Sequence, residues 1–420
     1  MPSSLSADQF ASLLRPGHRV FVPGCSGQSL LLDDWLRSNA AACAGVTFCG
    51  VLIPGINRTD YAALHPDARM EVIFLPPDFR ASYNRGQVDY LPLPYCNTYQ
   101  YYQQGPRFDL ALIQVSPPNA QGQCSFGLSA DFSPAAIDNA ACIVAHINPN
   151  MPFTQGPTIS VDRIDYCVEQ AAPLLEIHDE GEVPADVVAV ARQIVTHIHD
   201  GDTLQFGLGK MQRGILEQLR QHRNLRVHSG MVSDPLLLLA GAGSLADEPG
   251  SVTCGVALGT QPLYDFCTHD PRVTFAPVGY THQTRTLQDI AHLICINSCI
   301  EIDLLGQANG ETIKGQQISG TGGLVDFGRG ARLAKGGKYI LATPATAKNN
   351  TISRIVPRLG DQQLVSVTRQ DIDLVITEYG TADLRYKSVH QRAEALIAIA
   401  APQFREQLAA AWHDSMKHEL

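Results

Sequence analysis

The segment Gly201-Asp202-Thr203-Leu204-Gln205-Phe206-Gly207-Leu208-Gly209 decides the fold. Its apolar centre followed by glycines predicts a buried strand over 203–206 that ends in a tight turn. The apolar spacing after the turn predicts a helix over Met211–Arg220. Strand, glycine turn and helix form the repeating unit of α/β proteins with parallel sheets, so we expect this fold class.

The same pattern occurs earlier in the chain, where Gly17–Cys25 leads into a predicted helix over Gln28–Ser38. A second pair of similar segments is Phe108–Ile113 and Ile372–Thr377. These echoes indicate two similar α/β halves, and a chain of 420 residues is too long for one ordinary core. We place the boundary before Pro184 and predict domains over 1–183 and 184–420.

Further short apolar or β-branched runs, separated by amphipathic stretches, extend the alternation. The other predicted strands are Arg19–Val22, Leu110–Val115, Ile143–Ile147, Leu293–Ile296, Tyr339–Ala342 and Leu374–Thr377. The other predicted helices are Pro184–His197 and His390–Ala400.

Composition excludes several classes of function. The net charge of −10 argues against non-specific nucleic-acid binding. The start of the sequence lacks the features of a signal peptide, and no apolar stretch reaches the roughly 20 residues of a membrane span. The 11 cysteines show no disulfide framework and read as reduced, mostly buried thiols. We therefore expect a soluble cytoplasmic protein without nucleic-acid or membrane partners.

Glu301 is the strongest candidate for chemistry. It lies in Ile300-Glu301-Ile302-Asp303-Leu304-Leu305, where the apolar neighbours make a carboxylate costly without partners or a purpose. The turn Gly320-Thr321-Gly322-Gly323 follows, and its backbone N–H groups are open to a reacting acyl group. Together they suggest covalent work on an acyl compound, although burial alone leaves nucleophile and general base both open.

Other motifs have plainer readings. Gly207–Lys210 lacks the spacing of a P-loop or a dinucleotide fingerprint, so a tight strand-to-helix turn is favoured. The histidines 197 and 199 and the cysteines 295 and 299 lack zinc-ligand spacing, so we expect no metal site. Cys25 follows a glycine turn, but no base is placed beside it. Gly380 comes directly after a predicted buried strand and is either a strand cap or part of a site.

The ordered motifs resemble those of the acetyl-CoA hydrolase/transferase family, in particular the 4-hydroxybutyrate and itaconate CoA-transferases of family I. The resemblance covers nearly the whole chain. It rests on the blocks at residues 109–118, 148–152, 300–307, 317–323, 353–357, 377–380 and 395–400. It implies two tandem Rossmann-like open α/β domains, the second carrying the catalytic glutamate.

The resemblance also implies a ping-pong CoA transfer in which Glu301 is the nucleophile and a glutamyl-CoA thioester forms. Backbone amides at Val278 and Gly380 would stabilise the oxyanions. The segment Val278-Gly279-Tyr280-Thr281-His282 would hold coenzyme A, and Gly320, Gly322, Gly323 and Gly380 would line the same site. Acyl-CoA would be a substrate, no cofactor would be tightly bound, and the protein would be a homodimer.

Three departures from the family pattern bear on specificity: Gly230, Leu324 and Lys210. They replace a glutamate and a glutamine and add a lysine, which makes the site less acidic. We therefore expect a short acceptor such as succinate, itaconate or 4-hydroxybutyrate, with acetyl-CoA or succinyl-CoA as donor. An acyl-CoA hydrolase on the same scaffold and a non-enzymatic CoA-binding regulatory module are the alternatives.

Overall fold

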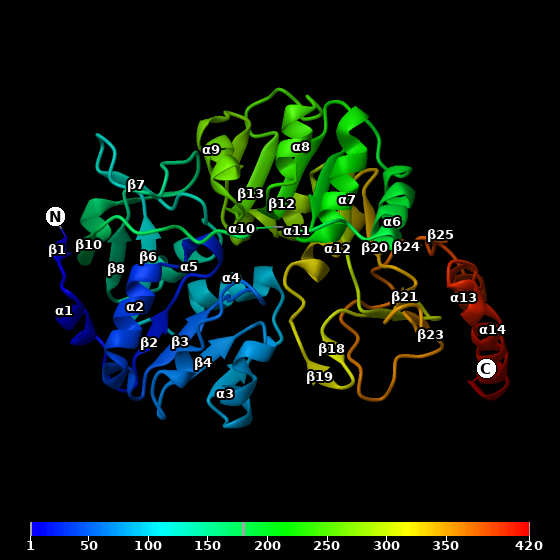
Figure 1. Cartoon of the computed structure of the whole chain (residues 1–420), viewed down its shortest axis with the longest axis horizontal. Coiled ribbons are helices and arrows are strands. Elements are labelled where there is room, and N and C mark those ends of the chain that lie inside the picture. Colours follow the sequence, from blue (N-terminus) through cyan, green and yellow to red (C-terminus); the bar gives the residue numbers. More distant parts are fainter. Residues whose placement is uncertain (1, 179–180, 420) are drawn as a thin grey trace. The chain divides into compact units, whose positions relative to one another are not determined.

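The computed structural model describes residues 2–178 and 181–419, in which helices and strands alternate along the chain (Figure 1). The chain divides into two compact units. The first comprises Met1–His178, Gly230–Asp234 and Glu248–Thr281, and the second comprises Asp179–Ser229, Pro235–Asp247 and His282–Leu420. The domain boundary after residue 183 stays a prediction.

The first large sheet lies in the first unit. Its strand order is β1 (Ser3–Ser4), β10 (Tyr166–Glu169), β8 (Ile143–Ile147), β6 (Leu110–Val115), β2 (Arg19–Phe21), β3 (Thr47–Gly50), β4 (Arg69–Val72) and β5 (Val88–Tyr90). All of these pairings are parallel, with Val20 opposite Phe48 on one side and Leu110 on the other. Every residue of β6 is buried, as expected for a parallel strand covered on both faces.

The second large sheet has the order β14 (Val273–Phe275), β13 (Val252–Ala257), β12 (Arg226–Val232), β11 (Thr203–Phe206), β15 (Leu293–Asn297), β20 (Lys338–Ala342), β24 (Leu374–Thr377) and β25 (Gly380–Asp383). β11 pairs in parallel with β12 and β15, while β25 returns antiparallel to β24. The predicted α/β class with parallel sheets is confirmed.

The two sheets share one topology, which supports the first sequence echo and corrects the second. In each, β2 or β11 is central and the next three strands add on one side; β6, β8 and β10, or β15, β20 and β24, add on the other. By this order β6 corresponds to β15, and β24 corresponds to β10. The echo between 108–113 and 372–377 was therefore wrong as a repeat, because both segments are simply buried parallel strands with the same apolar demands.

The predicted elements agree closely with the structure. The predicted strands Leu110–Val115, Ile143–Ile147, Thr203–Phe206 and Leu374–Thr377 are confirmed to the residue. The helices are α1 (Ala7–Ala11), α2 (Leu30–Ser38), α3 (Arg80–Asn84), α4 (Tyr95–Gln104), α5 (Ser133–Asp138), α6 (Ala185–Val195), α7 (Lys210–Gln218), α8 (Leu236–Gly241), α9 (Gln261–His269), α10 (Val278–Thr281), α11 (Thr284–Gln288), α12 (Leu324–Leu333), α13 (Val389–Ala398) and α14 (Pro402–Glu419). α2 begins later than predicted because Ser29 caps it, accepting a hydrogen bond from the Leu32 amide.

Short strands complete the fold. β16 (Glu301–Asp303) is the central strand of a three-stranded sheet, between β17 (Ala308–Asn309) and β23 (Ile355–Val356). The two-stranded pairs are β18 (Thr312–Ile313) with β19 (Gln316–Gln317), β21 (Thr346–Ala347) with β22 (Ile352–Ser353), and β7 (Gln123–Ser125) with β9 (Thr158–Ser160). Among the described residues, no helix combines the length and apolar character needed to cross a bilayer.

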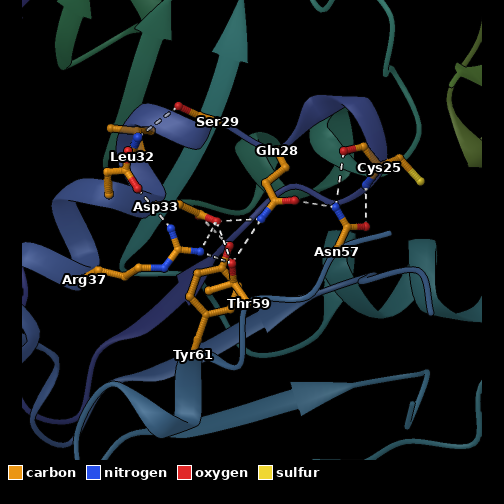
Figure 2. Close-up of polar contacts among 10 residues, drawn as sticks. Cys25, Gln28, Ser29, Leu32, Asp33, Arg37, Asn57, Thr59 and Tyr61 are labelled. Carbon is orange, nitrogen blue, oxygen red and sulfur yellow. Dashed lines mark hydrogen bonds and ion pairs between the residues drawn. The ribbon is translucent and has the colours of Figure 1, made fainter. Parts of the chain in front are cut away.

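A buried polar network joins the start of α2 to the loop after β3 (Figure 2). Asp33 accepts hydrogen bonds from Gln28 at 2.6 Å, from Thr59 at 2.9 Å and from Tyr61 at 2.7 Å. Asn57 donates to the Gln28 side chain at 2.6 Å. Such a network is stable only when its members are satisfied, so it fixes the path of the loop.

This network continues across the strands of the first sheet. The Gln114 side chain, on β6, donates to the Gln28 carbonyl at 3.2 Å and accepts from Asn148 at 2.9 Å. Residues after β2, on β6 and after β8 are thereby bonded to one another. At the carboxyl edge of this sheet, near its central strand, the polar side chains are therefore hydrogen-bonded to other groups of the same chain.

Asp131 is a buried acid of the first unit, just before α5. Its carboxylate accepts from the Phe132 amide at 2.7 Å and from the Ser129 hydroxyl at 3.4 Å. Burial raises its pKa from the ordinary 3.8 to about 6, because desolvation outweighs these hydrogen bonds. The folded protein therefore holds the Asp131 proton more tightly than the unfolded chain does.

This shift predicts how stability depends on pH. The contribution of Asp131 is fully present below pH 3.8 and is lost as pH rises to about 6. Asp131→Asn should flatten that fall, by up to about 3 kcal/mol in the free energy of unfolding. Urea unfolding of wild type and variant across this range measures the difference. The exposed Asp162→Asn variant is the control, and parallel curves for Asp131→Asn and wild type would contradict the assignment.

Candidate active site

Glu301 lies at the carboxyl edge of the second sheet, where strand order reverses. Strands β11 and β15 are neighbours there, although the chain adds strands on opposite sides of them. Asn297, the last residue of β15, exchanges hydrogen bonds with Gln205 of β11 at 2.9 and 3.4 Å. Ligands of open α/β sheets bind at such switch points. Glu301 begins β16 a few residues beyond this amide pair.

The strand β16 has one apolar and one polar face. Ile302 is fully buried and packs with Ala308 and Ile355 in one hydrophobic cluster. Because successive side chains of a strand alternate, Glu301 lies on the opposite face, where it is half-buried. The carboxylate therefore sits at the margin of the core and not inside it.

Asp303, on the same strand, is the fully buried acid of this segment. It accepts hydrogen bonds from the Leu305 amide at 3.0 Å, the Gln307 amide at 2.9 Å and the Gln307 side chain at 3.0 Å. These bonds close the turn that leads into β17. Of the two acids, Asp303 is therefore the one that shapes the backbone of the turn.

Asn309 is the direct partner of Glu301 and was missed from the sequence. The two residues are opposite each other in the β16–β17 ladder, and the Asn309 Nδ2 atom donates to Glu301 Oε1 at 2.8 Å. The signal was present: a turn at Gly306 after the Glu301 strand predicts a hairpin, and a hairpin places a residue of its second strand opposite Glu301.

Glu311 connects this hairpin to the segment before the glycine turn. Its carboxylate accepts from Ser366 at 2.6 Å and from Gln317 at 3.1 Å. Gln317 in turn donates to the Ser319 carbonyl at 2.9 Å. The approach to Gly320 is thus fixed by hydrogen bonds that begin two residues after Asn309.

The glycine turn packs closely on a buried histidine. Gly322 has a φ of 53°, and Gly323 is the N-cap of α12. A Cβ added at Gly323 would lie 2.5 Å from the ring of His282, which packs against Phe327 with 4.5 Å between ring centroids and 52° between the ring planes. Burial, helped by nearby His228, lowers the pKa of His282 to about 3, so its ring is neutral at physiological pH.

Gly380 lies where the β24–β25 hairpin begins its second strand, with a φ of 136°. Next to it, the Glu378 carboxylate accepts from the Ala345 amide at 2.7 Å, and the Ala345 carbonyl accepts from the Arg354 amide at 2.8 Å. The Arg354 side chain donates to the Ile300 carbonyl at 3.2 Å. A chain of hydrogen bonds therefore runs from Glu378, two residues before Gly380, to Ile300, directly before Glu301.

Most of the predicted coenzyme A segment forms α10, in the first unit. The Val278 amide donates to the Asp131 carbonyl at 2.9 Å, so its predicted role as an oxyanion donor requires a change of partner. Gly279 lets Tyr99 approach, because a Cβ there would lie 2.5 Å from the tyrosine ring. Tyr280 is exposed and Thr281 is buried. The roles of these four residues, like that of His282, stay predictions.

The three departures from the family pattern occupy different settings. The Lys210 ammonium donates to the Glu182 carbonyl at 3.1 Å. Leu324 begins α12 and lies 3.5 Å from the position of a Cβ on Gly310, directly after Asn309. Gly230 is part of β12 in the first unit, where its carbonyl closely approaches Gly255.

Cys25 has the backbone of a strained turn, with a φ of 48°, but the environment of a core residue. Its side chain packs with Val256 and Leu258. Burial and the nearby Asp131 raise the pKa of the Cys25 thiol well above its usual value. A thiol that is hard to ionise is a poor nucleophile. The cysteines 295 and 299 are likewise buried, and His197 contacts Thr381.

Comparison with known proteins gives a consistent result along the chain. Residues 4–176 match the family model of the acetyl-CoA hydrolase/transferase N-terminal domain, and residues 259–412 match that of the C-terminal domain. The 4-hydroxybutyrate coenzyme A transferase of Clostridium kluyveri is 36% identical over 96% of both chains. An acetyl-CoA hydrolase of Candida albicans is 24% identical over 74% of this chain and 67% of its own.

Solved structures agree with the fold. The 4-hydroxybutyrate CoA-transferase of Porphyromonas gingivalis superposes with a TM-score of 0.81 and 30% identity, covering 100% of this chain and 98% of its own. RipA from Yersinia pestis superposes with a TM-score of 0.90 and 26% identity, covering 99% and 98%. The expected tandem architecture of family I CoA-transferases is confirmed by these neighbours.

The contact between Gly323 and His282 predicts a specific sensitivity. Gly323→Ala should lower the free energy of unfolding by about 1–3 kcal/mol, because the buried ring of His282 has to move. Gly241→Ala is the matched control: it lies in helix α8 with nothing within 4 Å of the added Cβ. Urea unfolding measures both. Equal stability of Gly323→Ala and wild type would show that the turn adjusts freely.

Proposed function

Because the chain belongs to the acetyl-CoA hydrolase/transferase family, we propose that it is an acyl-CoA:carboxylate CoA-transferase whose nucleophile is Glu301. The observation that carries the proposal is the placement of Glu301: a half-buried carboxylate at the switch point of a parallel sheet, held by Asn309. Relatives at 31–36% identity are named as CoA-transferases, and the acids in their names include 4-hydroxybutyrate, acetate, succinate, butyrate and cyclohexane-1-carboxylate.

The proposed reaction proceeds in two exchanges. A Glu301 oxygen attacks the acyl carbon of the donor, the C–S bond breaks, and a mixed anhydride and CoA thiolate result. The thiolate attacks the Glu301 Cδ atom and expels the donor acid, leaving a glutamyl-CoA thioester. An acceptor carboxylate then reverses both steps and leaves as its CoA thioester. Covalent catalysis of this kind conserves the thioester bond.

The remaining details are part of the proposal. Amides at Val278 and Gly380 would stabilise the oxyanions, and the segment 278–282 with Gly320, Gly322 and Gly323 would bind coenzyme A. The loss of acidic and amide side chains at Gly230 and Leu324, with the gain of Lys210, supports an anionic or hydroxylated acceptor. No tightly bound cofactor is proposed. The homodimer and the cytoplasmic location stay predictions.

Trapping the intermediate tests the nucleophile. After incubation with acetyl-CoA and mild borohydride, we expect mass spectrometry to find Glu301 reduced to the primary alcohol, because borohydride reduces the thioester. Glu301→Ala should lose at least about 10³-fold in CoA exchange, as expected for removal of a covalent nucleophile. An adduct on a cysteine instead of Glu301 would overturn the assignment.

A panel of acceptors separates transfer from hydrolysis. With acetyl-CoA as donor, free CoA should accumulate slowly without an acceptor, while succinate, itaconate or 4-hydroxybutyrate should be converted rapidly to its CoA thioester. Butyrate, of equal length to 4-hydroxybutyrate, should be a poorer acceptor. Equal CoA release with and without acceptor would establish the hydrolase, and a preference for butyrate would refute the predicted specificity.

A further inference from the structure

Four arginines of the second unit gather around two aspartates. The arginines, here called the arginine cluster, are Arg329, Arg332, Arg369 and Arg392. The Asp371 carboxylate pairs with Arg329 Nε at 3.4 Å and with Arg332 Nη1 at 3.6 Å. The Asp373 carboxylate pairs with Arg332 Nε at 3.2 Å. Two negative charges therefore face four positive charges.

Arg369 and Arg392 are the two members of the arginine cluster that these aspartates leave unpaired. The Arg392 side chain, on α13, donates from Nη1 to the Arg369 carbonyl at 2.6 Å, which holds the two residues together. Within the described residues, neither guanidinium makes an ion pair with a carboxylate. Arg369 is exposed and Arg392 is half-buried. An anion could therefore reach both side chains from solvent.

The positive charges of the arginine cluster act on one another. Burial lowers the pKa of the Arg392 guanidinium, the positive charges of Arg369 and Arg332 lower it further, and Asp373 opposes them with a smaller effect. Arginine does not lose its proton in proteins, so deprotonation cannot relieve this repulsion. A bound anion would relieve it.

We propose that the arginine cluster binds a phosphate group, with Arg369 and Arg392 as its main ligands. A phosphate group carries a charge of about −1.5 to −2 near neutral pH, which matches the two positive charges that the aspartates leave uncompensated. The planar fork of a guanidinium also fits two phosphate oxygens at once. The neighbouring Asp371 and Asp373 would repel an extended polyanion such as nucleic acid, so the site suits a small ligand.

The position of the arginine cluster separates it from the predicted coenzyme A site. Asp373 directly precedes β24, and its carboxylate accepts from the Tyr339 amide, near the start of β20, at 3.0 Å. Because β20 and β24 are parallel, both contacts lie at the amino edge of the second large sheet. Ligands of open α/β sheets bind at the opposite, carboxyl edge. The phosphate site is therefore additional to the proposed function and does not rest on it.

Isothermal titration calorimetry of the full chain with inorganic phosphate, at constant ionic strength, tests the site. Arg369→Gln keeps the backbone carbonyl that holds Arg392 and breaks none of the ion pairs above, so the fold should be preserved. Its affinity for phosphate should fall at least about tenfold, as expected for the loss of a charge-assisted hydrogen bond. Arg369→Lys should show an intermediate loss, because it keeps the charge without the planar fork.

Arg192→Gln is the matched control, because it removes an exposed arginine of α6 in the same unit. It should bind phosphate as the wild type does. Equal phosphate affinity of Arg369→Gln and wild type would overturn the proposal, and so would succinate binding as tightly as phosphate. An equal loss of coenzyme A affinity in Arg369→Gln would place these arginines in the coenzyme A site and overturn the separate site.

Phenyl phosphate distinguishes the two sources of the phosphate group. Tighter binding of phenyl phosphate than of inorganic phosphate would assign the site to a phosphate monoester, and the reverse order would assign it to the free ion. Either order supports the proposal, provided that Arg369→Gln weakens the binding of the preferred compound. These measurements need no catalysis, so a failure of the proposed function would leave them unchanged.

Discussion

Parallel strand pairing is the constraint on which the rest of this structure depends. A parallel strand must be followed by a crossover, and all strands of the sheet then end at the same edge. Where the order of addition reverses, crossovers leave in opposite directions and the strand ends between them lie uncovered. In each sheet the central strand, β2 or β11, meets this condition beside β6 or β15.

The two sheets meet the constraint with different residues. In the first, Gln28, Gln114 and Asn148 bond to one another, and Asp33 completes a network of satisfied donors and acceptors. In the second, Gln205 and Asn297 pair, and the chain then projects a small sheet that carries Glu301. One topology thus supports a closed polar core in one half and, in the other, a carboxylate that accepts a hydrogen bond through its Oε1 atom.

Much of the fold could be predicted from the sequence because a buried parallel strand can be recognised from its own run of apolar residues. Leu110–Val115 and Thr203–Phe206 are continuous runs bounded by turn signals, and their limits were correct. Because buried strands share this apolar composition, segments 108–113 and 372–377 look like a repeat although they occupy different positions in their sheets. Any buried parallel strand selects similar residues, so likeness alone does not establish correspondence. Strand order depends on long-range pairing, which no local pattern encodes.

A candidate site residue could be predicted where it interrupts the local apolar pattern of a strand. A residue that matters through its cross-strand partner could not be predicted in this way. Glu301 stands out because a carboxylate interrupts an apolar strand. Asp303 interrupts the same apolar strand, yet its carboxylate accepts three hydrogen bonds from residues of the turn. Alternation places both acids on the face opposite Ile302. What separates them is their partners: Asp303 is fully buried and accepts hydrogen bonds from the turn, whereas Glu301 is paired with Asn309 across the ladder. Cross-strand register therefore decides which carboxylate closes the turn and which faces Asn309.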